Sequence, residues 1–180
     1  MEYETQHQID VMYTEEQINH KICELGEQIS KDYAGRSIHL ICVLKGGVCF
    51  MTELAKRITV PVSMDFMCVS SYGSQTKSSG NLIMKKDLDE PVEGRDVLVV
   101  EDIIDSGRTL SNLLELLKER NASSIKLCTL LNKPERRVVD VKIDYNGFSI
   151  PDEFVVGFGL DYDQKYRNLP FIGIVRLQED

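Results

Sequence analysis

Three acidic residues near the middle of the chain, Glu101, Asp102 and Asp105, are the side chains best placed to do chemistry. They follow the apolar run 97–100 and precede the small polar stretch 106–109, after which leucines recur at helical spacing. This order predicts a buried strand whose C-terminal end delivers carboxylates into a loop, and the loop then opens a helix. In open parallel sheets, ligands bind at that edge.

The polar stretch Ser106, Gly107, Arg108 and Thr109 suits the binding of a phosphate. Backbone N–H groups and hydroxyls at the start of a helix form a cup that favours an anion. Acids beside an anion would repel it, so they suggest metal ions or sugar hydroxyls as their own partners. A solvated strand end with an ordinary helix cap is the alternative, but the complete order of strand, acids, cup and helix favours a functional site.

The composition is that of a soluble globular protein. A length of 180 residues predicts one domain, residues 1–180, with a substantial core. The formal charge of −8 argues against nucleic acid held by bulk electrostatics, although a local basic face stays open. The first residues do not resemble a secretory signal, and no apolar run approaches the ~20 residues that span a bilayer, so no membrane partner is expected.

The five cysteines are scattered and form no CxxC motif, and the three histidines lack ligand-like spacing. Reduced core thiols in a cytoplasmic protein are expected, and a zinc site is not. Hydrophobic periodicity predicts alternating strands and helices, which indicates a mostly parallel sheet covered on both faces. The expected helices are one that starts at the capping box 14–17, one over 48–58 and one over 110–120. The expected strands are 38–44, 62–69, 82–86, 97–100 and 125–131, with further short strands suggested by Ile143, Tyr145 and the run 154–160.

The central string 99–110 resembles the phosphoribosyl-pyrophosphate (PRPP) signature of the type I phosphoribosyltransferases. Ser106 and Arg108 stand where other members have Thr and Lys, which keeps the chemistry of the cup. The resemblance covers residues about 10–177. It implies the α/β type I phosphoribosyltransferase fold, a mostly parallel central sheet flanked by helices. It also implies a small hood formed by parts of the N-terminal segment and about 134–180, and a flexible lid loop over 70–81.

Two further segments fit the family. Lys45-Gly46-Gly47 is by itself only a turn, but beside the signature it resembles the pyrophosphate loop, in which the lysine–glycine peptide can be cis. The resemblance implies that Lys45, Gly46 and Arg167 bind pyrophosphate. The polar loop 70–80, with Ser71 and Tyr72, resembles the closing loop of the hypoxanthine-guanine branch, where a lid would exclude water from the reaction.

The run 154–162, followed by 165–170, resembles the C-terminal purine hood of the same 6-oxopurine branch, and Lys133 matches a lysine of that branch outside the hood. Lys133 would donate to the 6-oxo oxygen, which distinguishes hypoxanthine or guanine from adenine. Phe154 would stack on the base, the Val155 backbone would meet the purine edge, and Asp161 would lie near the base edge and a second metal ion.

The implied reaction is the Mg²⁺-dependent transfer of the phosphoribosyl group from PRPP to hypoxanthine or guanine, giving IMP or GMP and pyrophosphate. Residues 105–109 would hold the 5′-phosphate. Glu101 and Asp102 would hold ribose hydroxyls and Mg²⁺, with Asp161 as a further metal ligand. Asp105 would accept the N7 proton of the purine. The family is usually dimeric or tetrameric, so a homodimer or homotetramer is expected, with residues 45–50 and the neighbouring helix as a candidate interface.

Two other functions remain open on sequence grounds. A PRPP-sensing regulator that binds RNA would need a basic surface, which the overall charge opposes. A transferase for adenine, orotate or uracil would share the central signature but carry a different hood, and Lys133 together with the run 154–161 favours a 6-oxopurine. A PRPP synthetase would need two such domains, and this chain has room for only one, which argues against that function.

Overall fold

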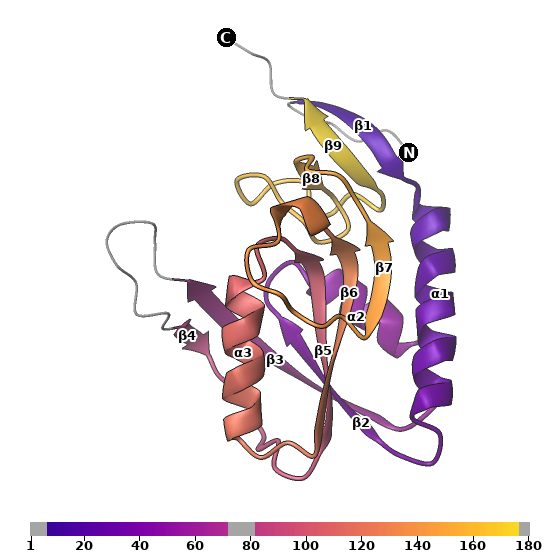
Figure 1. Cartoon of the computed structure of the whole chain (residues 1–180). Coiled ribbons are helices and arrows are strands. Elements are labelled where there is room, and N and C mark those ends of the chain that lie inside the picture. The colour runs from indigo at the N-terminus through magenta and orange to yellow at the C-terminus, as the bar shows by residue number, and fades with distance from the viewer. Residues whose placement is uncertain (1–6, 72–81, 177–180) are drawn as a thin grey trace.

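A six-stranded sheet forms the centre of the molecule (Figure 1). The computed structural model describes residues 7–71 and 82–176. The strand order is β4-β3-β2-β5-β6-β7, and every neighbouring pair is parallel except β3 and β4. The predicted α/β class is confirmed. The strands are β2 (Ile38–Val43), β3 (Val62–Ser71), β4 (Leu82–Lys86), β5 (Asp96–Ile104), β6 (Ser124–Asn132) and β7 (Tyr145–Ser149).

The order of the strands reverses between β2 and β5. From β2 the chain moves outward to β3, and it then returns to β5 on the opposite side of β2 and continues to β6 and β7. At such a reversal the connections after the two central strands diverge to opposite faces, which opens a crevice at the carboxyl edge of the sheet. The segments after β2 and β5 therefore face each other there.

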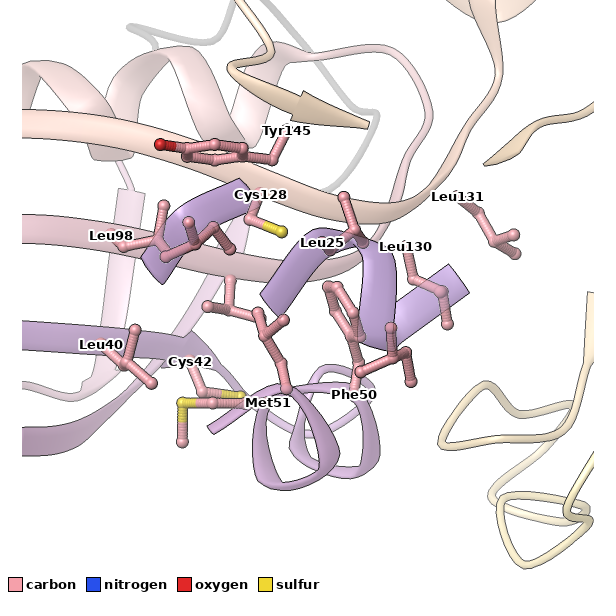
Figure 2. Packing of buried hydrophobic residues seen from close by; sticks show 14 of the residues in the cluster. Leu25, Leu40, Cys42, Phe50, Met51, Leu98, Cys128, Leu130, Leu131 and Tyr145 are labelled. Atoms are coloured by element: carbon pink, nitrogen blue, oxygen red, sulfur yellow. The ribbon is translucent and has the colours of Figure 1, made fainter. Parts of the chain in front are cut away.

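Helices cover both faces of this sheet (Figure 1). Helices α1 (Glu15–Asp32) and α2 (Val48–Ala55) pack on one face, where they meet Leu40 and Cys42 of β2. Helix α3 (Arg108–Glu119) packs on the other face, against Ile41 and Val43. Every residue of β2 is buried because successive side chains point to opposite faces and both faces are covered. Figure 2 shows part of the larger cluster, including Leu98 and Cys128 beside the helices.

The helix boundaries follow local chemistry. At the start of α1, the Thr14 hydroxyl accepts a hydrogen bond from the backbone N of Gln17 at 3.2 Å, and the Gln17 side chain accepts one from the backbone N of Thr14 at 2.9 Å. This confirms the predicted capping box. Helix α2 ends at Ala55 rather than at 58, because the backbone N–H groups of Arg57 and Ile58 donate to carbonyls three residues back.

A second, antiparallel sheet lies beyond the carboxyl ends of β6 and β7 (Figure 1). Its order is β1-β9-β8, formed by β1 (Gln8–Tyr13), β9 (Ile172–Arg176) and β8 (Val155–Val156). The periodicity of the sequence did not predict β1 or β9. This sheet joins segments from the two ends of the chain and carries its own small apolar cluster, which consists of Val156, Tyr166, Leu169 and Val175.

Besides the end of α2, three further predicted boundaries were wrong. Strand β5 runs on to Ile104, because its pairing with β6 continues past the acids, so Glu101 and Asp102 lie in the strand and only Asp105 follows it. The strand predicted over 154–160 is reduced to β8, because residues 157–159 have φ angles between 50° and 100° that end the extended backbone. Asp161 therefore lies between two tight turns, which are closed by the bridges Gly157–Leu160 and Tyr162–Lys165. The loop predicted from residue 70 begins later, since β3 includes Ser71.

The cysteines carry no disulfide, and Cys42 and Cys128 lie in the core. Burial raises the pKa of the Cys42 thiol to about 12, which leaves it protonated and unreactive. Among the described residues, no helix has both the length and the apolar character needed to cross a membrane.

We expect Thr14→Ala to lower the free energy of unfolding by about 1 kcal/mol, the usual cost of losing an N-cap side chain. Urea unfolding followed by circular dichroism measures the change. Thr52→Ala is the matched control, because the Thr52 hydroxyl donates only to carbonyls of its own helix, Val48 O and Cys49 O at 3.0 Å each. Equal losses in the two variants would mean that the capping box contributes nothing specific.

Candidate active site

A cavity of about 310 Å³ lies at the crevice between the carboxyl ends of β2 and β5. It brings together most of the residues that the sequence singled out: Lys45, Gly46, Glu101, Asp102, Asp105, Ser106, Gly107, Thr109, Asp161 and Arg167. They come from positions more than a hundred residues apart. The predicted residues Arg108, Lys133, Phe154 and Val155 do not line this cavity.

The backbone of the loop after β2 lies in close contact with the acids of β5. A Cβ atom on Gly46 would lie 1.6 Å from Oδ2 of Asp102, so only glycine fits at this position. The non-proline cis peptide in this loop is Leu44–Lys45. The resemblance left open whether the peptide between Lys45 and Gly46 is cis, and the cis bond lies one residue earlier. The side chain of Lys45 is left exposed at the mouth of the cavity.

The two acids of β5 are withdrawn from water. The Asp102 side chain is buried, and its Oδ1 accepts a hydrogen bond from the backbone N of Ile103 at 2.8 Å. Oε2 of Glu101 is buried without a hydrogen-bond partner. Burial raises the pKa of both carboxyls, and the Asp102 charge raises that of Glu101 further, well above its ordinary value. When this carboxyl is ionised, its unpartnered oxygen is suited to a cation or to a hydroxyl donor from a ligand.

The predicted phosphate cup lies at the N-terminus of α3. Gly107 has a φ of +81°, and a Cβ there would lie 2.5 Å from the carbonyl oxygen of Val139. The carbonyl of Ser106 accepts hydrogen bonds from the backbone N–H groups of Val138 and Val139 at 3.0 Å each. The segment after β6 therefore packs against the cup and holds its backbone in place. The first N–H groups of α3 have no carbonyl partner within the helix, which suits an anion.

Two cations, Lys45 and Arg167, line the same cavity. Nη2 of Arg167 lies 2.6 Å from Oδ1 of Asp161, and Nη1 donates to the carbonyl of Gly159 at 2.7 Å. Nζ of Lys45 donates to Oε1 of Gln164 at 3.0 Å. Gln164 thus links the two predicted pyrophosphate ligands, since Nη2 of Arg167 also reaches it at 3.5 Å. Sequence reasoning missed Gln164, because a glutamine in a turn carries no motif.

Lys133 is buried, with 7% of its surface exposed, although a lysine after a strand is ordinarily solvated. Its backbone N donates to the carbonyl of Ile104 at 3.0 Å, and its Nζ lies 3.6 Å from Oδ1 of Asp152. Asp152 also contacts Arg136, which pairs with Asp105. Neither Asp152 nor Arg136 was singled out from the sequence, because isolated charges on loops give no periodic signal.

The other predicted purine and lid residues take different environments. Phe154 is half-exposed, and its ring meets the Tyr162 ring edge-on at 5.5 Å between centroids. Val155 is buried and pairs with Ile174 across β8 and β9. Ser71 ends β3, and Tyr72 lies outside the described residues.

Comparison with known proteins agrees with this geometry. The model of the phosphoribosyl transferase domain family matches residues 10–163. A hypoxanthine-guanine phosphoribosyltransferase from Streptococcus thermophilus is 55% identical over 166 residues, which is 92% of each chain.

Solved structures show the same likeness. A hypoxanthine phosphoribosyltransferase from Staphylococcus aureus aligns with a TM-score of 0.89 at 48% identity, over 93% of this chain and 91% of that one. A hypoxanthine-guanine phosphoribosyltransferase from Bacillus anthracis, solved with HEPES in its active site, aligns with a TM-score of 0.89 at 45% identity, over 95% and 99%. This chain therefore belongs to the phosphoribosyltransferase family, within its hypoxanthine-guanine branch.

Proposed function

We propose that this protein is an enzyme of purine salvage that transfers the 5-phosphoribosyl group from PRPP to a 6-oxopurine. The products are IMP or GMP and pyrophosphate. One observation carries the proposal: a phosphate cup, a buried acid pair and two cations line one cavity at the strand-order reversal. The names of the relatives supply the purine class.

PRPP would lie along the cavity. Its 5′-phosphate suits the cup formed by Asp105, Ser106, Gly107, Arg108 and Thr109, at the N-terminus of α3. Glu101 and Asp102 face the ribose hydroxyls. Lys45, the Gly46 backbone and Arg167 neutralise the departing pyrophosphate, and the planar guanidinium of Arg167 suits two phosphate oxygens at once.

The acid pair also fits Mg²⁺. The unpartnered Oε2 of Glu101 is the kind of oxygen that a hard cation binds, and Asp102 lies beside it. Within residues 7–71 and 82–176, no three acidic, histidine or cysteine side chains converge on one point. Mg²⁺ often takes one or two carboxylates together with substrate oxygens. The proposed ligands are Glu101, Asp102 and Asp161, which line the same cavity. When bound, it would offset the negative charge that develops on the leaving pyrophosphate.

The purine would approach from the side of Lys133 and Asp105. The Lys133 ammonium would donate to the 6-oxo oxygen, and the Asp105 carboxylate would accept the N7 proton as N9 attacks C1′. Phe154 would cover the base, since its ring is half-exposed, and Val155 and Asp161 would meet the purine edge. Ser71 and Tyr72 are proposed to begin a lid that excludes water from the reaction.

We also propose that the enzyme assembles as a homodimer or homotetramer in the cytoplasm. The apolar side chains of Val62 and Met64 in β3 are 36% and 52% exposed. A second copy of the chain would cover these two side chains. Phe50, within the segment expected at the interface, is instead buried in the core of its own chain. Free cysteines suit a reducing compartment.

Steady-state rates with PRPP, Mg²⁺ and each purine in turn test the proposed function. Pyrophosphate release with hypoxanthine or guanine, and little with adenine, is expected. Release that requires adenine, or none with any base, would contradict the proposal.

Asp105→Asn should lower kcat with hypoxanthine by about a hundredfold or more, the usual contribution of a general base. PRPP binding should persist, because the amide keeps the shape of the side chain. Asp140→Asn, at an exposed position on the connection between β6 and β7, is the control and should keep full turnover. If kcat of Asp105→Asn stays within a few-fold of wild type, Asp105 is not the base.

Lys133→Ala should weaken purine binding by about 1.5–3 kcal/mol, the value of a hydrogen bond from a charged donor. The test is the purine KM at saturating PRPP, with Lys142→Ala as control because the Lys142 side chain is 86% exposed. A rise in the PRPP KM alone, with the hypoxanthine KM unmoved, would place Lys133 outside the base pocket.

Glu101→Gln should stabilise the ligand-free protein increasingly as the pH rises from 5 to 8. Burial raises the pKa of Glu101 in the folded state, so this carboxyl keeps its proton at pH values where the unfolded chain has lost it. The folded state then binds more protons than the unfolded state, and stability falls with rising pH; glutamine removes that loss. Urea unfolding at both pH values, without Mg²⁺ or PRPP, measures it. A gain that does not grow with pH would disprove the assignment.

A further inference from the structure

We propose that Arg136 is a positioning residue that holds the Asp105 carboxylate in its working orientation by tying it to Asp152. This inference rests on the proposed function, in which Asp105 is the general base. It assigns a role to a residue that touches neither the cavity nor, in our account, the substrate.

Four side chains of alternating charge form a continuous row. Nε of Arg136 lies 2.8 Å from Oδ1 of Asp105, and its Nη1 lies 3.4 Å from both carboxylate oxygens of Asp152. Nζ of Lys133 lies 3.6 Å from Oδ1 of the same Asp152. The row therefore connects the proposed base with the proposed donor to the 6-oxo oxygen.

The row spans the carboxyl ends of three neighbouring strands. Asp105 directly follows β5, Lys133 directly follows β6, and Asp152 lies three residues after β7. Arg136 ends the short 3₁₀ turn Pro134–Arg136, and its backbone N donates to the carbonyl of Lys133 at 3.3 Å. The turn thus places Arg136 between the two acids.

The chemistry of the guanidinium explains why an arginine occupies this position. Its planar fork presents Nε and Nη1 toward different partners, so one side chain can bridge two carboxylates. A lysine has a single nitrogen and cannot reproduce both geometries. The Asp105 side chain is 48% exposed, so it would otherwise be free to sample several rotamers.

Orientation matters for a general base, because proton transfer requires the carboxylate oxygen within about 3 Å of the proton donor. Arg136 occupies Oδ1 of Asp105, which leaves Oδ2 as the oxygen available to the purine N7 proton. The bridge therefore fixes which oxygen acts, and the row sets its place relative to Lys133.

The first test compares Arg136→Gln with Arg36→Gln. Arg36 is a matched control: its side chain is 47% exposed against 51% for Arg136, and it pairs with Asp96 at 3.3 Å. It precedes β2, so it lies at the opposite edge of the sheet. Arg136→Gln should lower kcat with hypoxanthine about two- to fivefold, the range that an exposed ion pair supports. Its PRPP KM should be unchanged, and Arg36→Gln should behave as wild type.

The decisive test repeats Arg136→Gln in an Asp105→Asn background, with enzyme in excess over PRPP so that slow turnover is measurable. A residue that acts through Asp105 should then have no further effect on the rate. An equal loss in both backgrounds, a rise in the PRPP KM, or a kcat equal to that of Arg36→Gln would overturn the inference. If wild type makes no nucleotide from hypoxanthine or guanine, the proposed function itself fails instead.

Discussion

The parallel pairing of β2 with β5 is the constraint on which the site depends. Their register places Cys42 opposite Val100, so the loop after β2 meets the acids of β5 at the same level of the sheet. The contact is so close that Gly46 has no room for a side chain beside Asp102. Because the strand order reverses between these two strands, this meeting point opens into a cavity rather than into a packed core.

Burying charged groups in the site costs electrostatic free energy, and a bound substrate complex can offset that cost. Two adjacent carboxyls are buried at the end of β5, and both have raised pKa values because burial disfavours their charged forms. In the same cavity, Lys45 contacts Gln164 and Arg167 contacts Asp161. In the proposed reaction, a polyanionic substrate that arrives with Mg²⁺ would bring a cation to the acids and an anion to Lys45 and Arg167 in the same binding event.

Much of this arrangement could be predicted from the sequence. The strand, acids, cup and helix from Val97 to Leu117 are contiguous in the sequence. Periodicity and turn chemistry were therefore sufficient to predict their order. Local patterns could not show that β1 and β9 pair, because their partners lie more than 150 residues apart. Arg136, Asp152 and Gln164 were missed for the same reason: their roles arise from tertiary contacts between loops. The end of β8 was misjudged although residue type signalled it: Gly157 and Gly159 both take positive φ angles, which glycine adopts readily, and only Phe158 does so without that freedom.

The central claim is that one cavity joins PRPP to a 6-oxopurine. It is tested most directly by incubating the enzyme with PRPP, Mg²⁺ and an equimolar mixture of hypoxanthine, guanine, adenine, orotate and uracil, and by identifying the nucleotides by mass. We expect IMP, GMP or both to dominate, because the role proposed for Lys133 is to donate to a 6-oxo oxygen, and adenine has no acceptor there. AMP, or a pyrimidine nucleotide, as the main product would contradict this account.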